Sequence, residues 1–99
     1  MPKYKVIVSR HVAENLLMHT AFISNVSPNA AESFVLEFED ILNRLEDNPI
    51  HYQKDTSFDN PDGYRRVLFA KWYKCLFLIE GDTVYVDSVV DCRQNPDKL

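Results

Sequence analysis

The sequence predicts an α+β fold in which a strand and a hairpin of two helices precede three antiparallel strands. Three observations indicate it. Apolar residues follow a helical spacing up to about residue 47, and β-rich runs begin at residue 64. Ser27-Pro28 divides the helical half, and Gly81-Asp82 divides the β-rich half. A chain of 99 residues is expected to form one domain, residues 1–99.

The first two elements are a short strand and a helix. Residues 3–8, KYKVIV, form a β-rich run that predicts the strand. Ser9 follows and can cap a helix, because its hydroxyl can accept a hydrogen bond from a free backbone N–H of the first turn. From Arg10 to about Asn25 the chain has no glycine or proline, and apolar residues recur at helical spacing.

The second helix has the clearest pattern. Ser27 can cap it, and Pro28 suits its first turn, where a missing N–H costs nothing. Asn48 precedes Pro49, which disfavours the helical region and ends the helix near Asp47. Spacings of three and four separate the apolar residues Ala31, Phe34, Val35, Phe38, Ile41, Leu42 and Leu45. The short turn between the helices predicts an antiparallel hairpin.

A loop and a meander are expected next. Residues 48–63 have no period and contain two prolines, two asparagines, three aspartates and a glycine. The three expected strands are residues 64–69, 73–80 and 83–93, and residues 94–99 are expected to be frayed. The helices are expected to cover one face of this sheet.

The Gly81-Asp82 turn sets a register that sorts the side chains into two faces. The apolar face, assigned to the helix side, pairs Ile79 with Val84, Phe77 with Val86 and Cys75 with Ser88. The other face pairs Leu78 with Tyr85, Leu76 with Asp87 and Lys74 with Val89, and it includes Arg93. Two helices cover only one face, so Leu76 and Leu78 are expected to remain open to a partner.

The two cysteines are not expected to form a disulfide. In this register Cys92 faces Lys71, so it lies out of reach of Cys75. Two cysteines without paired histidines nearby also make no zinc signature, and neither a metal nor a cofactor is expected.

The chain resembles the RelE/ParE superfamily of toxins, which belong to type II toxin–antitoxin systems. The resemblance spans nearly the whole chain and rests on the order and spacing of its parts. These parts are the A..F...F...L.RL...P pattern from Ala30 to Pro49, Tyr64-Arg65-Arg66, the run from Tyr73 to Ile79, and Val89-Val90-Asp91-Cys92-Arg93-Gln94.

The resemblance implies one of several activities. RelE-like members cleave mRNA at the ribosomal A site, and this activity is the first expectation. ParE-like members inhibit DNA gyrase without nuclease residues, and a decayed toxin would only bind its antitoxin. In each case the resemblance implies a cognate antitoxin as partner, with the ribosome and mRNA, or DNA gyrase, as target.

For RNA cleavage, the resemblance implies a basic catalytic cluster of Arg65, Lys74 and Arg93 on the open sheet face, where cations would stabilise the developing negative charge. Substrate contacts are expected from Lys54 in the loop and Tyr85 on the sheet. The chain departs from the RelE-like pattern in two places. Val67 stands where a second lysine is expected, and Leu99 where a tyrosine is expected.

Charge and hydropathy bound the remaining expectations. The net charge of −4 is unusual for a nucleic-acid binder, and the basic excess is confined to residues 64–99, with six basic and five acidic residues. No apolar run is long enough to span a bilayer, and no signal peptide is evident, so a cytoplasmic location without membrane contact is expected.

Overall fold

The computed structural model describes residues 3–93. It confirms the predicted α+β fold and its β-α-α-β-β-β order. The elements are β1 (Lys5–Val8), α1 (Arg10–Val26), α2 (Pro28–Asp47), a short 3-10 turn (Pro49–His51), β2 (Arg65–Phe69), β3 (Tyr73–Glu80) and β4 (Thr83–Asp91). The predicted frayed end, residues 94–99, and the departure at Leu99 lie outside the described residues.

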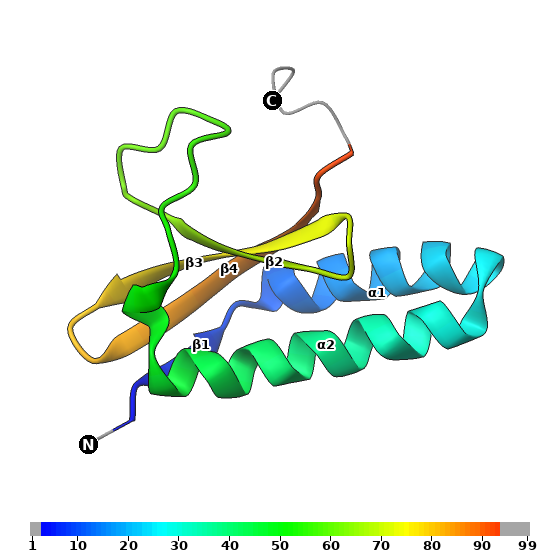
Figure 1. Ribbon diagram of the computed structural model, residues 1–99, viewed down its shortest axis with the longest axis horizontal. Coiled ribbons are helices and arrows are strands. Elements are labelled where there is room, and N and C mark those ends of the chain that lie inside the picture. Colours follow the sequence, from blue (N-terminus) through cyan, green and yellow to red (C-terminus); the bar gives the residue numbers. More distant parts are fainter. Residues whose placement is uncertain (1–2, 94–99) are drawn as a thin grey trace.

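The four strands form one mixed sheet in the order β1-β4-β3-β2. Strands β2, β3 and β4 make the predicted antiparallel meander, while β1 lies parallel to β4. Both helices pack against the same face of this sheet, and the long loop between α2 and β2 lies on the opposite side (Figure 1). The molecule therefore has a helix layer, a sheet, and a loop over the far face.

The helix hairpin is formed by local signals around two serines. The Ser9 hydroxyl accepts from Val12 N at 3.3 Å at the start of α1. Ser27 ends α1, because its N–H donates to the Ile23 carbonyl at 2.8 Å. Its hydroxyl then accepts from Ala30 N at 3.2 Å and caps α2. One residue thus closes one helix and starts the next, which makes the connection very short.

The core lies between α2 and the sheet. Every third or fourth residue of α2 is buried: Ala31, Phe34, Phe38, Ile41 and Leu45. Phe34 stacks on Phe69 of β2 with ring centroids 5.3 Å apart. Fully burying one such side chain stabilises the fold by roughly 1.5–3 kcal/mol. Only Val12 of α1 is fully buried, so α1 leaves much of its apolar surface exposed.

A β-bulge changes the register that the sequence predicts. Near the turn the prediction is confirmed, with Ile79 opposite Val84 and Phe77 opposite Val86. Beyond this point it is wrong, because Asp87 has no partner and Leu76 pairs with Ser88. One extra residue in a strand reverses which face each later side chain occupies.

The two cysteines are free thiols, which confirms that no disulfide joins them. Cys75 is buried on the helix side, where desolvation raises the pKa of its thiol to about 12. Cys92 is exposed, and its backbone pairs with Trp72 rather than with Lys71. Within the described chain, neither helix combines the length and apolar character needed to cross a membrane.

Candidate functional site

The sheet face away from the helices, here called the open face, carries a large hollow. The side chains of β2, β3 and β4 on this face include Arg66, Leu68, Lys74, Leu76, Leu78, Tyr85, Ser88, Val90 and Cys92. The hollow has a volume of about 490 Å³, and residues 55–58 of the loop form one of its walls. A second hollow of about 220 Å³ lies toward β1, beside Tyr64.

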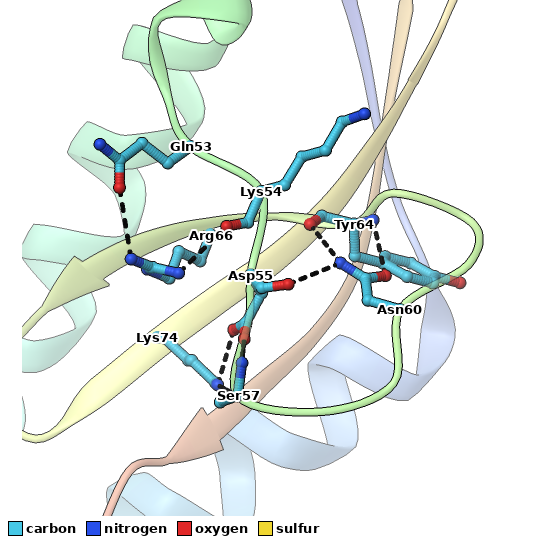
Figure 2. Close-up of polar contacts among 8 residues, drawn as sticks. All are labelled: Gln53, Lys54, Asp55, Ser57, Asn60, Tyr64, Arg66 and Lys74. Carbon is cyan, nitrogen blue, oxygen red and sulfur yellow. Dashed lines mark hydrogen bonds and ion pairs between the residues drawn. The ribbon is translucent and has the colours of Figure 1, made fainter.

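Lys74 of β3 is buried beneath the loop, where it forms an ion pair with Asp55. Its Nζ lies 2.6 Å from Asp55 Oδ2 and donates to the Ser57 hydroxyl at 2.6 Å. The Asp55 side chain has no exposed surface, and its Oδ1 accepts from the N–H and the hydroxyl of Ser57 at 2.7 and 2.6 Å. Lys74 thus joins the open face to the loop (Figure 2).

The charges of Lys74 and Asp55 balance each other. Burial by itself would raise the pKa of Asp55, but hydrogen bonds from Lys74 and Ser57 outweigh it and hold the pKa below its ordinary value of 3.8. Asp55 is therefore ionised at neutral pH and matches the positive charge of Lys74. Removing one partner of a buried pair leaves the other uncompensated, which typically costs about 3–5 kcal/mol.

The loop is closed on itself by Asn60. The amide of Asn60 donates to the carbonyls of Asp55 and Tyr64, both at 2.9 Å, and its oxygen accepts from Tyr64 N at 2.9 Å. Asp55 N also donates to the Tyr64 carbonyl at 2.8 Å. Gly63 allows the chain to turn back, with φ of +80°. These contacts hold the loop as a formed structure over the sheet (Figure 2).

Arg66 is a basic residue of the open face that the sequence analysis did not select. It donates to the Lys54 carbonyl at 3.1 Å and to the Gln53 side chain at 3.4 Å. It lines the large hollow together with Leu68, which is 65% exposed. The strand pattern alone could not identify Arg66, because both faces of this run carry apolar residues. The burial of Val67 and Phe69 places Arg66 on the outward face with Leu68.

The expected placement of Arg65 on the open face is wrong. Arg65 shares its strand face with Val67 and Phe69, which belong to the core under the helices. Its guanidinium donates to the carbonyls of Tyr52 at 2.6 Å and Ile50 at 3.3 Å. Arg65 therefore holds the chain that follows α2 through two hydrogen bonds from its Nη1 to backbone oxygens.

The expected placement of Arg93 beside Lys74 is also wrong, because the bulge at Asp87 reverses the end of β4. Arg93 lies on the helix side, where it lines a hollow with residues of α1. Its Nε and Nη2 donate to the two oxygens of Asp91 at 3.1 and 2.8 Å. These bonds lower the pKa of Asp91, and they neutralise the charge of Arg93.

Among the remaining selected residues, Leu76 lines the large hollow, and Leu78 and Tyr85 line the small one. The expectation that Leu76 remains open to a partner is wrong, because the loop lies over this part of the sheet and Leu76 is only 8% exposed. Tyr85 is 40% exposed on the predicted face. Lys54 lies in the loop and pairs with the edge of β2 at Arg65. Its amine points away from Lys74 and Asp55 in Figure 2.

The predicted basic cluster is therefore not assembled. Of its three members only Lys74 is on the open face, and each member is occupied by a carboxylate or by backbone carbonyls. Asp55 and Ser57 were not predicted to belong to the site, because no local pattern links residues of this loop to a side chain of β3. Among residues 3–93, no group of three His, Cys, Asp or Glu side chains is placed to hold a metal ion.

Comparison with known proteins adds no assignment. No model of a known protein family matches the chain, and no curated protein matches it.

Proposed function

We propose that this chain is the toxin of a type II toxin–antitoxin pair and that it acts by binding a protein target, as ParE-like members bind DNA gyrase. The proposal favours this alternative over mRNA cleavage. The observation that carries it is the buried ion pair of Lys74 with Asp55. Lys74 is the one residue of the predicted catalytic cluster on the open face, and Asp55 neutralises its charge. The toxin class itself rests on the resemblance described from the sequence.

The charges around Lys74 and Arg93 oppose RNA cleavage. A ribonuclease of this type lowers its barrier with cations aimed at the negative charge that develops on phosphate. Here Lys74 Nζ lies 2.6 Å from a carboxylate oxygen, and Arg93 Nη2 lies 2.8 Å from another. A phosphate approaching Lys74 would meet the buried charge of Asp55. The net charge of −4 also opposes binding to RNA.

The argument for protein binding is the apolar character of the same face. Leu68, which is 65% exposed, lines the large hollow beside Phe58 of the loop, and the buried Leu76 also contributes to its wall. Contiguous exposed apolar side chains bordered by polar groups are typical of interaction surfaces. An antitoxin segment that folds on binding, or a target protein, would bury these side chains through apolar contacts without requiring a positively charged surface.

Two assays on the purified chain distinguish these activities. We expect inhibition of DNA gyrase supercoiling, and no cleavage of mRNA on translating ribosomes. Leu68→Asp should abolish inhibition, because it places a charge on the proposed contact surface. Leu17→Asp is the matched control, since Leu17 is 74% exposed on α1, and it should inhibit normally.

Other results would decide against the proposal. Cleavage of mRNA by the wild-type chain, lost in Lys74→Gln, would establish the interferase activity instead. If expression does not slow bacterial growth and supercoiling is unaffected, the chain only binds its antitoxin. A neighbouring gene for a DNA-binding antitoxin would support the toxin class independently of the target.

A further inference from the structure

A separate hollow lies on the helix side, where the end of β4 meets the helix hairpin. Its volume is about 260 Å³. Its walls are mostly apolar and include Phe22, Ile23 and Val26 of α1, Phe34 of α2 and Trp72. Phe22, Val26 and Trp72 are exposed, so the hollow is accessible from outside. None of the residues of the open face lines it.

A buried hydroxyl whose hydrogen has no acceptor belongs to this hollow. Tyr73 lines the hollow and is only 3% exposed. Burial raises the pKa of Tyr73, and a side-chain hydrogen bond from Arg93 partly offsets this rise. A guanidinium can only donate, so the hydrogen of the hydroxyl still lacks an acceptor among the described residues. Buried polar groups in native proteins nearly always have a partner, so this donor indicates a missing one.

The position of the Tyr73 ring is fixed by its neighbours. Its centroid lies 5.0 Å from the ring of His19 and 4.8 Å from the ring of Phe34, both in edge-to-face contact. His19 is itself held by a contact of its Nε2 with the Val89 carbonyl at 3.0 Å. The ring therefore cannot turn easily to find another partner, and the hydroxyl stays available to a molecule that enters the hollow.

The second polar group of the hollow is Arg93. An arginine has five N–H donors, and two of those of Arg93 serve Asp91. The remaining three belong to a side chain that lies over the Trp72 ring, 5.4 Å from its centroid. Because Asp91 balances the guanidinium, the hollow offers donors without a net positive charge. Such a site favours a neutral acceptor over an anion.

We propose that this hollow binds a small uncharged aromatic molecule whose carbonyl oxygen accepts a hydrogen bond from the Tyr73 hydroxyl. The ring of the ligand would lie among Phe22, Ile23 and Val26. The size is suitable, because an apolar cavity of about 150 Å³ accommodates benzene. This site is independent of the proposed toxin activity, which concerns the opposite face of the sheet.

Titration with acetophenone, followed by NMR, tests the proposal. Trp72 is the only tryptophan of the chain, so its indole N–H signal reports on the hollow without ambiguity. We expect saturable shifts of that signal, with a Kd in the millimolar range for so small a ligand. Tyr73→Phe keeps the ring and removes the donor, and it should weaken binding about tenfold. Tyr85→Phe removes a hydroxyl from the opposite face and should bind as the wild type does.

Three results would overturn the proposal. The first is no saturable shift of the Trp72 signal with acetophenone. The second is equal affinity of the wild type and a folded Tyr73→Phe variant, which would show that the hydroxyl does not take part. The third is tighter binding of benzoate than of acetophenone, since the charge of Asp91 should disfavour an anion.

Discussion

Lys74 and Asp55 are 19 positions apart in the sequence, yet their side chains form a buried ion pair with Nζ and Oδ2 separated by 2.6 Å. The pair is the polar connection between the centre of the sheet and the loop that covers it. Ser57 completes it by accepting from Lys74 and donating to Asp55. The loop over the open face is therefore held by its contacts with Lys74 of the sheet as well as by hydrogen bonds within the loop.

The first prediction concerns this pair. Lys74→Met removes the cation and leaves the Asp55 carboxylate buried without its main partner, so the free energy of unfolding should fall by about 3–5 kcal/mol. Urea denaturation measures the change. Replacing both residues, in Lys74→Met with Asp55→Leu, should restore much of the stability. Lys71→Met, at an exposed position, is the control. A single variant as stable as wild type would contradict the prediction.

The second prediction is a dependence of stability on pH. The pKa of Asp55 in the folded chain is below its ordinary value of 3.8, so the unfolded chain takes up the proton first as pH falls. The stabilisation is complete above that value, and it decreases between 3.8 and the lower folded pKa. Chemical denaturation at several pH values measures it. The pKa of Asp91 is also lowered, so Asp91 contributes to stability in the same direction. The contribution of Asp55 is therefore the difference in free energy of unfolding between wild type and Asp55→Asn. This difference should shrink below pH 3.8.

The third prediction concerns Tyr73. The hydrogen of its buried hydroxyl has no acceptor, so Tyr73→Phe removes an unsatisfied donor and keeps the ring packing. Stability should stay the same or rise by about 1 kcal/mol. Thermal denaturation of this variant beside Tyr85→Phe, whose hydroxyl is on the exposed face, provides the comparison. A clear loss of stability in Tyr73→Phe alone would mean that the hydroxyl already has a partner.

The fourth prediction concerns the closure of the loop. Asn60→Ala removes three hydrogen bonds that join the two ends of the loop. Unfolding should require about 1–3 kcal/mol less free energy, and amide exchange should accelerate in residues 53–64. Asn43→Ala, on the exposed side of α2, is the matched control. Unchanged exchange in the loop would indicate that the Lys74–Asp55 pair is sufficient to hold it.

Local signals explain which parts of the fold the sequence could predict. Ser27 and Pro28 define the hairpin because capping and helix initiation depend on neighbouring residues. Glycine at position 81 defines the last turn in the same way. The fold class, the two helices and the antiparallel meander of β2, β3 and β4 follow from such signals, whereas the parallel pairing of β1 with β4 does not.

The candidate site could not be predicted in the same way, because its contacts join residues that are far apart in the sequence. The run YRRVLF has apolar residues on both faces, so its pattern did not decide whether Arg65 or Arg66 pointed outward. The packing of Val67 and Phe69 under α2 decides it. The contact of Lys74 with Asp55 joins a strand to an irregular loop, and no spacing rule connects them.

The unpaired Asp87 has a consequence for how this chain can change. A deletion of that single codon would make the β3–β4 ladder continuous and would keep its other pairs, because Phe77 already pairs with Val86 and Leu76 with Ser88. Cys92 would stay on the open face, and Asp91 and Arg93 would stay on the helix side. The end of β4 can therefore lose one residue without moving any side chain to the other face.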